Sequence, residues 1–201
     1  MFDSALLVPA AIGAALAYLA GSLSTAVLVC RALGLPDPRT EGSRNPGATN
    51  VLRLGGRLPA ALTLVGDALK GYLPVVVAAL VFDHPPSVAL VALAAFLGHL
   101  YPVFFDFRGG KGVATALGAL LGVSLTVGAL ALLVWLAVSL TFRRSSVAAL
   151  ATFALVPAFL LIEGLRVHAV LFVGVAALLF YTHRANIARL VAGTEPLIGK
   201  R

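Results

Sequence analysis

Long hydrophobic stretches alternate along this chain with short polar segments. An α-helix needs about 20 apolar residues to cross the hydrocarbon core of a lipid bilayer, and most of these stretches come near that length. The pattern therefore predicts an all-α, polytopic integral membrane helix bundle, with residues 1–201 forming a single domain. The apolar stretches cover about 5–30, 58–82, 86–105, 113–141, 146–162 and 166–182.

The stretch at 113–141 is ambiguous, because its length suits neither one span nor two. As one helix it would be about 43 Å long, whereas the hydrocarbon core is about 30 Å thick. As two spans it is short, and Gly122 and Gly128 bracket the place for a turn. Basic loops stay on the cytoplasmic side. If this stretch forms two spans, every Arg- and Lys-rich segment lies on that side. We therefore predict about seven spans, with the N-terminus outside and the C-terminus inside.

The composition agrees with a membrane protein, since 60% of the 201 residues are hydrophobic and only 11% are charged. Soluble domains carry about 25% charged residues. The 15 Lys and Arg residues against 8 Asp and Glu give a net charge of +7, which in a soluble protein would suggest nucleic acid as a partner. Here the positive-inside rule explains the basic loops. We expect a lipid bilayer as the partner, and no nucleic acid.

Four polar segments fall on the predicted cytoplasmic side, and they are rich in glycine, small hydroxyls, asparagine and cations. This composition suits phosphate, because backbone N–H groups freed by glycine can form an anion-binding nest. The first segment is "EGSRNPGATN" at 41–50, and a loop of helix-capping residues would have the same composition. Its candidate binding residues are Gly42, Ser43, Asn45, Gly47, Thr49 and Asn50.

The second segment, "FRGGKG" at 107–112, precedes a helix predicted to start near Val113. Glycines let a backbone approach a ligand closely, and a helix N-terminus favours an anion. The segment is not a Walker A loop, because Ser or Thr does not follow its Gly-Lys pair. A positive-inside loop is the alternative interpretation. The residues that would contact phosphate here are Arg108, Gly109, Gly110, Lys111 and Gly112.

Four ionisable residues in or beside the spans are further candidates. Asp67 and Lys70 are three residues apart on one helix face and can pair; the pair is either functional or a buried structural ion pair. His99 and His183 suit proton transfer or a hydrogen bond to phosphate, although a histidine at a membrane interface is often an anchor or a cap. We expect no metal site, because the chain has no His pair at i, i+4 and no Cys cluster.

Five segments together resemble one family, the acyl-phosphate-dependent glycerol-3-phosphate acyltransferases of bacteria, or PlsY family. They follow the family's order and spacing over nearly the whole chain. The sequence departs from the family at two positions, with Arg44 in place of the usual glycine and Arg108 in place of the usual lysine. The segments are "GSLSTAVLV" at 21–29, "GSRNPGATNVLR" at 42–53, "GDALKGYLPV" at 66–75, "GHLYPVFFDFRGGKGVAT" at 98–115 and "HRANIARLVAGTE" at 183–195.

The resemblance implies a membrane enzyme of phospholipid biosynthesis that moves a fatty acyl group from acyl phosphate to the 1-hydroxyl of glycerol 3-phosphate. The products would be lysophosphatidic acid and phosphate. No metal or other cofactor is implied. The expected location is the bacterial inner membrane, with the active site at the cytoplasmic face. We expect a monomer, in possible contact with the enzyme that produces acyl phosphate.

Family roles carry over to Ser43, Arg53, the glycine loop around Lys111, His183, Asn186 and Glu195. With the segments above, the candidate catalytic residues are Ser43, Arg53, Lys111, His183 and Asn186. The candidate substrate- or phosphate-binding residues are Gly42, Asn45, Gly47, Thr49, Asn50, Lys70, His99, Arg108, Gly109, Gly110, Gly112, Ser146 and Glu195.

Acyl phosphate is a mixed anhydride, so an alcohol can attack it directly and no acyl-enzyme is required. The proton acceptor stays open between His99, His183 and a phosphate of the substrate itself. Two functions of other classes also remain: a transporter or channel for a phosphorylated solute, and a non-catalytic membrane scaffold. A transporter needs access to its site from both faces, whereas the predicted outer turns are short.

Overall fold

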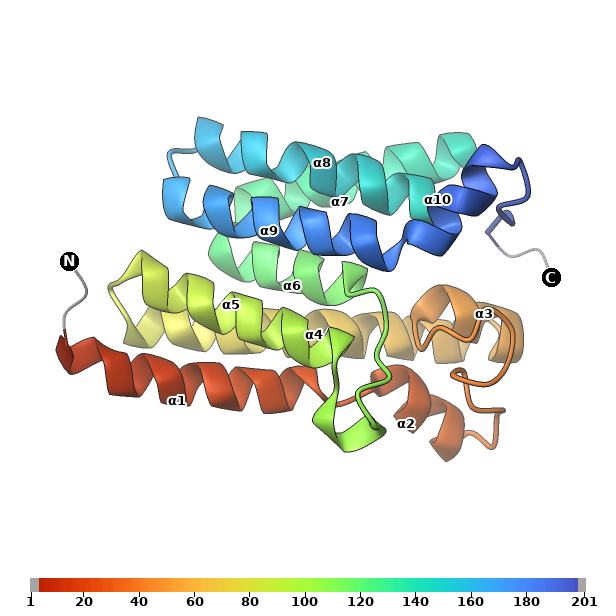
Figure 1. The fold of residues 1–201 in the computed structure, drawn as a ribbon, viewed down its shortest axis with the longest axis horizontal. Helices are drawn as coiled ribbons and strands as arrows, with labels where there is room; N and C mark the ends of the chain where they lie inside the picture. The colour runs from red at the N-terminus through yellow and green to blue at the C-terminus, as the bar shows by residue number, and fades with distance from the viewer. Residues whose placement is uncertain (1–3, 199–201) are drawn as a thin grey trace.

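The computed structural model describes residues 4–198, and within that range the chain forms ten α-helices, one short 3₁₀ turn and no β-strand. Seven of the helices follow the apolar stretches, and three short ones, α2, α3 and α10, lie at one end of the molecule (Figure 1). The elements are α1 (Ser4–Gly21), α2 (Thr25–Ala32), α3 (Ala48–Gly55), α4 (Arg57–Val81), α5 (Pro85–Leu100), η1 (Val103–Phe105), α6 (Val113–Val123), α7 (Leu125–Phe142), α8 (Ser145–Ile162), α9 (Arg166–Thr182) and α10 (Arg184–Val191).

The first apolar stretch was predicted as one span, but it is broken between α1 and α2. The break follows from close packing: a Cβ on Gly21 would lie 2.2 Å from the carbonyl oxygen of Ala95, so α1 and α5 touch through their backbones. The break also frees the carbonyl of Leu23, which accepts a hydrogen bond of 2.8 Å from Nζ of Lys70 in α4. A side chain 47 residues away therefore stabilises the interruption.

The ambiguous stretch at 113–141 forms two helices, as predicted, and the turn lies between Gly122 and Gly128. Ser124 ends α6 and begins α7, and its hydroxyl accepts a hydrogen bond of 3.1 Å from the backbone N–H of Val127. With 11 residues, α6 is about 16 Å long, too short to cross a core of about 30 Å alone.

The all-α membrane fold is confirmed, although seven complete spans are not. Within the described residues five segments are long and apolar enough to cross a bilayer, and the bent pair α9–α10 gives a sixth. The short α6 is not among these segments, so the count of about seven spans stays a prediction. The orientation, with the N-terminus outside, stays a prediction.

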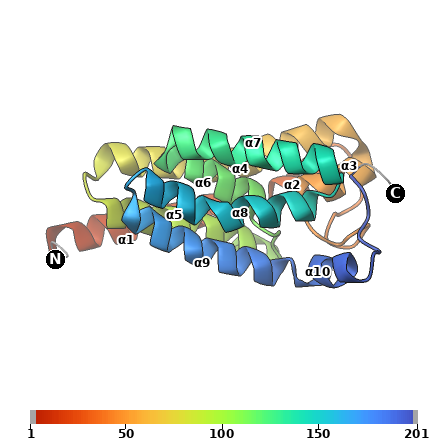
Figure 2. The same cartoon turned by 90° about the horizontal axis from the view of Figure 1, so that it is seen from above.

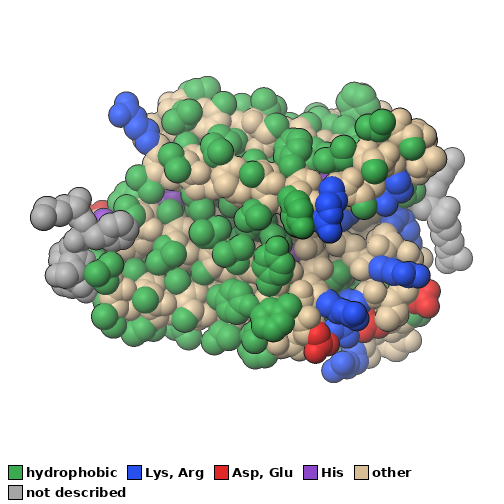
Figure 3. All heavy atoms as spheres, in the orientation of Figure 1, with side chains coloured by type: hydrophobic (Ala, Val, Ile, Leu, Met, Phe, Trp, Pro, Cys, Tyr) green, Lys and Arg blue, Asp and Glu red, His purple; other side chains and the backbone are tan. Residues whose placement is uncertain are grey.

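The helices lie side by side along the long axis of the molecule (Figures 1 and 2). Small residues allow the closest approach, as expected for helices packed in lipid. A Cβ on Gly71 would lie 2.1 Å from the carbonyl oxygen of Thr115, and a Cβ on Gly118 would lie 2.0 Å from that of Ala68, so α4 and α6 are in backbone contact. Most Lys and Arg side chains visible in Figure 3 gather at the end that carries α2, α3 and α10, and hydrophobic side chains cover most of the rest.

Candidate active site

A cavity of about 930 Å³ lies between the polar segments and continues among the helices. Four helices begin at its wall, because residues at or next to the N-termini of α3, α6, α8 and α10 line it. A helix N-terminus presents unpaired N–H groups and a partial positive charge. Their convergence makes the polar end of the cavity an anion site. The lining residues from these N-termini are Ala48, Val113, Ser145 and His183.

Charged side chains add to this positive field. Cations outnumber carboxylates in the lining formed by the described residues, and each carboxylate has a cation beside it. The cavity therefore keeps a net positive charge, as phosphate binding requires. The cations are Arg44, Arg53, Lys111 and Arg189, and the carboxylates are Asp67 and Glu195.

A network of hydrogen bonds joins the glycine loop to the C-terminal segment. Lys111 Nζ donates to Asn186 Oδ1, and Asn186 Nδ2 donates to Glu195 Oε1 at 2.6 Å. Ser146 Oγ donates to the same oxygen at 2.6 Å, and Arg189 Nε donates to Oε2 at 2.8 Å. Glu195 thus fixes the amide of Asn186 so that its oxygen faces Lys111.

Burial and neighbouring charges set the ionisation of this network. Burial lowers the pKa of Lys111 to about 8, although the charge of Glu195 acts in the opposite direction. Burial acts to raise the pKa of Glu195, but the hydrogen bonds from Ser146, Asn186 and Arg189 bring this pKa below its ordinary value. Glu195 is therefore ionised at neutral pH, and Lys111 titrates close to neutrality.

Asn50 holds the first loop in shape. Its two N–H groups donate to the carbonyls of Pro38 and Glu41, both at 3.0 Å, and its Oδ1 accepts 2.9 Å from the backbone N–H of Ser43. Gly42 has φ +62°, and a Cβ there would lie 2.3 Å from this same oxygen. Both amide donors of Asn50 are therefore used by backbone, and Ser43 beside it also lines the cavity.

The glycines of the second segment let it lie directly on the end of α5. Gly110 N–H donates to the carbonyl of His99 at 3.2 Å. A Cβ on Gly109 would lie 2.1 Å from that carbonyl oxygen, and a Cβ on Gly110 would lie 2.3 Å from Nε2 of His99. The loop that carries Lys111 is thus positioned by His99.

The expected Asp67–Lys70 ion pair is confirmed, with 2.8 Å between Nζ and Oδ1. His99 Nδ1 lies 3.6 Å from the same carboxylate oxygen and 3.1 Å from the hydroxyl of Thr115. All four side chains are buried. This cluster lies under the glycine loop, and Lys70 does not line the cavity.

His183 is buried at the bend between α9 and α10, where only 3% of its surface is exposed. Its Nδ1 lies 2.8 Å from the carbonyl oxygen of Leu179. A carbonyl only accepts hydrogen bonds, so Nδ1 carries the proton. In the neutral ring Nε2 is then unprotonated, which suits it to accept a hydrogen bond from a hydroxyl.

Away from the polar end the cavity becomes apolar. Leu64 and Val65 of α4, Leu117 and Leu121 of α6 and Trp135 of α7 line this arm. The arm was not predicted, because it exists only between packed helices. The apolar side chains that line this arm suit a hydrocarbon chain.

The structure brings most of the predicted residues together, from all four polar segments. Of the others, Arg108 and Gly109 line a smaller neighbouring cavity, and Lys70 and Gly110 line neither. Arg189, which also lines the cavity, was not predicted, although its spacing of three from Asn186 on one helix face indicates a shared site. The predicted residues that line the large cavity are Gly42, Ser43, Asn45, Gly47, Thr49, Asn50, Arg53, His99, Lys111, Gly112, Ser146, His183, Asn186 and Glu195.

These features define a polytopic α-helical membrane protein with a cationic cavity that extends into an apolar arm. A family profile described as glycerol-3-phosphate acyltransferase matches residues 11–193. The chain belongs to this family of acyltransferases, and the resemblance seen in the sequence is confirmed.

Similar proteins cover nearly the whole chain. The glycerol-3-phosphate acyltransferase of Thioalkalivibrio sulfidiphilus is 55% identical over 186 residues, which are 92% of each chain. That of Methylococcus capsulatus is 54% identical over 188 residues, covering 92% of this chain and 94% of its own. The crystal structure of PlsY, an integral membrane glycerol 3-phosphate acyltransferase, in its glycerol 3-phosphate form is 39% identical, with a TM-score of 0.90 and coverage of 94% and 95%. The crystal structure of its lysophosphatidic acid form is 38% identical to this chain, with a TM-score of 0.88 and the same coverage.

Proposed function

We propose that the chain transfers a fatty acyl group from acyl phosphate to the 1-hydroxyl of glycerol 3-phosphate, giving lysophosphatidic acid and inorganic phosphate. One observation carries the proposal: a single cavity joins a cationic end, where four helices begin, to an apolar arm. Both substrates carry phosphate, and one carries a hydrocarbon chain. The names of the relatives, and the two ligand forms of the similar crystal structure, agree with this substrate and product.

In this reaction the cationic end binds the phosphates. Lys111 and Arg53 neutralise their charge, together with the free N–H groups at the start of α6. Ser43 bonds to a substrate oxygen, and Asn186 is held by Glu195 so that it orients both Lys111 and the acceptor. The acyl chain lies in the apolar arm.

The transfer itself is direct. The 1-hydroxyl oxygen forms a bond to the acyl carbonyl carbon, and the bond between that carbon and the phosphate oxygen breaks. Phosphate leaves with the electron pair, and the hydroxyl proton goes to Nε2 of His183. Positioning and stabilisation of the developing negative charge supply the rate. No acyl-enzyme is formed.

Replacing each histidine by Gln tests the proton step. His183→Gln should lower turnover by 10²-fold or more, whereas His99→Gln should act more weakly, through the loop that carries Lys111. Near-normal turnover of a variant with both histidines replaced would refute a histidine base and assign the proton to a substrate phosphate instead.

We further propose that the cation-rich end faces the cytoplasm of a bacterial inner membrane, as the positive-inside rule indicates. The cavity is formed within one chain, so a monomer would suffice for turnover. Contact with the enzyme that produces acyl phosphate stays a prediction.

The deciding experiment combines purified protein, acyl phosphate and glycerol 3-phosphate and follows lysophosphatidic acid, with Lys111→Ala as the inactive control. Product from acyl-CoA but not from acyl phosphate would refute the proposed donor. No product, together with uptake of labelled glycerol 3-phosphate into vesicles, would refute an enzyme and favour a transporter.

A further inference from the structure

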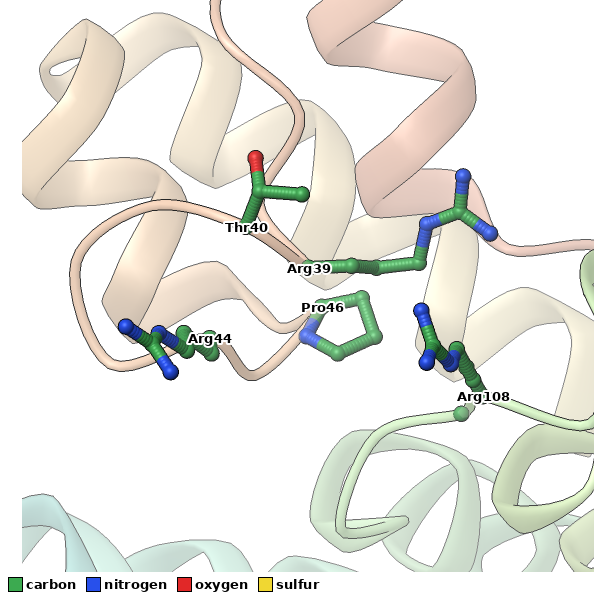
Figure 4. A pocket seen from close by; sticks show the side chains of 6 residues that line it. Arg39, Thr40, Arg44, Pro46 and Arg108 are labelled. Carbon is green, nitrogen blue, oxygen red and sulfur yellow. The ribbon is translucent and has the colours of Figure 1, made fainter.

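A second, smaller cavity of about 470 Å³ lies beside the first. Three arginines from separate parts of the chain line it: Arg39 after α2, Arg44 in the first polar loop and Arg108 before the glycine loop. The backbones of these two loops meet here, because a Cβ on Gly110 would lie 2.9 Å from the carbonyl oxygen of Pro46. In Figure 4 the guanidinium groups of Arg39 and Arg108 approach the same space on one side of Pro46, and Arg44 lies on the other side.

Arg39 is a fixed wall of this cavity. Its guanidinium makes a two-pronged ion pair with Asp37, with Nη2 at 2.8 Å from Oδ2 and Nε at 3.1 Å from Oδ1. It also lies 3.8 Å from the exposed carboxylate of Asp106 and 5.9 Å from the centre of the Phe105 ring. Its charge is therefore largely balanced, and its position is set.

Arg44 and Arg108 are different, because both are exposed and neither forms an ion pair with a carboxylate in the described part of the chain. The cavity consequently has cationic side chains available for a ligand. Guanidinium groups without a carboxylate partner suit the oxygens of a phosphate group.

Arg44 also connects the two cavities, since it lines both. Its backbone has φ +54°, a conformation that favours glycine. In this chain the strained position carries a cation to the mouth of the large cavity.

We propose that Arg44 and Arg108, with Arg39 as a fixed wall, form a separate phosphate-binding site at the mouth of the large cavity. The site binds the phosphate of a monoester or of an anionic lipid headgroup, and it concentrates phosphate next to the reaction site by electrostatic attraction. Only the identity of the ester, glycerol 3-phosphate, rests on the proposed function. The binding of phosphate itself does not.

The test counts bound inorganic phosphate by equilibrium dialysis, with the protein in nanodiscs of neutral phosphatidylcholine at low salt. In the wild type, phosphate should bind both in the large cavity and at the proposed site, and Lys111→Ala should lose the binding in the large cavity. Introduced into Lys111→Ala, Arg44→Gly should weaken the binding that remains about tenfold, the size of one lost charged hydrogen bond. The fold should tolerate this change, because glycine adopts the local conformation more readily.

Arg143→Gly is the matched control. Arg143, which follows the last residue of α7, is also exposed and also has φ +54°, but it lines neither cavity. It should bind as much phosphate as the wild type. The inference is overturned if Lys111→Ala binds no phosphate, or if Arg44→Gly and Arg143→Gly have equal effects.

Nanodiscs with 30% phosphatidylglycerol separate the two sources of phosphate. If inorganic phosphate still binds at the site that depends on Arg44, the ligand is a free ester; if the lipid displaces it there, the ligand is a headgroup. Either result supports the site, whereas displacement that does not depend on Arg44 contradicts it. Failure to form lysophosphatidic acid would refute the proposed function. Phosphate binding that depends on Arg44 would still support the second site, because this measurement does not require turnover.

Discussion

Removing the carboxylate of Glu195 tests how the cavity is organised. Glu195 accepts hydrogen bonds from Ser146 and Asn186 at 2.6 Å and from Arg189 at 2.8 Å. In Glu195→Ala these donors lose their partner. Asn186 is then free to rotate, and its amide oxygen no longer holds Lys111 in place.

The magnitude follows from burial. Ser146 and Asn186 are 2% and 7% exposed, and a buried donor without a partner costs about 1–3 kcal/mol. Arg189 is 40% exposed at its side chain and can turn to water, so it adds little. Because the cavity can admit water to both buried donors, we take the lower end for each, about 1 kcal/mol, which gives about 2 kcal/mol for the two together. That corresponds to a fall in Tm of about 4–8 °C for a chain of this size.

The effect on turnover should be larger than the effect on stability. A misplacement of about 1 Å among groups that position a substrate can cost about 10²-fold, so kcat/KM for glycerol 3-phosphate should fall about 100-fold. Glu195→Gln should be milder, within about tenfold, because its carbonyl can still accept from both Ser146 and Asn186. Only Arg189 would lose its partner.

Lysophosphatidic acid formation and thermal unfolding of the three proteins, in one detergent, measure both effects. Glu163→Ala is the matched control, because Glu163 also accepts a hydrogen bond of 2.6 Å, from Ser124. It follows α8, and the turn between α8 and α9 lies at the opposite end of the bundle from α10 (Figure 1). Wild-type kinetics in Glu195→Ala would refute the reasoning. Equal losses in Glu195→Gln and Glu195→Ala would show that charge, and not hydrogen-bond geometry, is what matters.

Three further predictions follow from the same contacts. Because the pKa of Lys111 is lowered to about 8, the free enzyme loses the charge of Lys111 as pH rises through about 8. The value of kcat/KM for glycerol 3-phosphate should therefore fall over that range. Lys111→Arg should abolish this fall, since Arg stays charged. Gly118→Ala should prevent correct folding, because its Cβ would lie 2.0 Å from the carbonyl oxygen of Ala68, whereas Gly174→Ala has open space and should be neutral in gel filtration and thermal unfolding. Asn50→Ala should lower stability by about 2 kcal/mol through its lost backbone partners, and an unchanged Tm would contradict a structural role.

The spans could be predicted because apolar length is a property of the local sequence. The structure places α4, α8 and α9 within one residue of the predicted stretches at 58–82, 146–162 and 166–182. The break after α1 could not be predicted, because it depends on contacts made by α4 and α5. The short helices α3 and α10 lie in segments too polar to stand out by hydropathy.

The members of the site could be predicted better than their roles. The distribution of Arg and Lys along the sequence predicted that four polar segments lie on one side of the membrane, and residues from all four line the cavity. Asn50 and Asn186 nevertheless looked alike in the sequence. Asn50 bonds to backbone within 12 residues of itself, whereas Asn186 joins Lys111, 75 residues away, to Glu195. Partners that distant are set by helix packing, which periodicity does not reveal.

The two carboxylates in the cavity show how an acid can be placed beside bound phosphate. Asp67 is paired with Lys70 three residues later, and Glu195 with Arg189 six residues earlier. Each negative charge is therefore balanced within its own segment, so it does not repel the substrate. Each carboxylate can still accept hydrogen bonds in a fixed direction. Asp67 lies beside His99, which supports the glycine loop, and Glu195 orients Asn186. In a site that must attract anions, a paired carboxylate can position cationic and amide groups without cancelling the field that they produce.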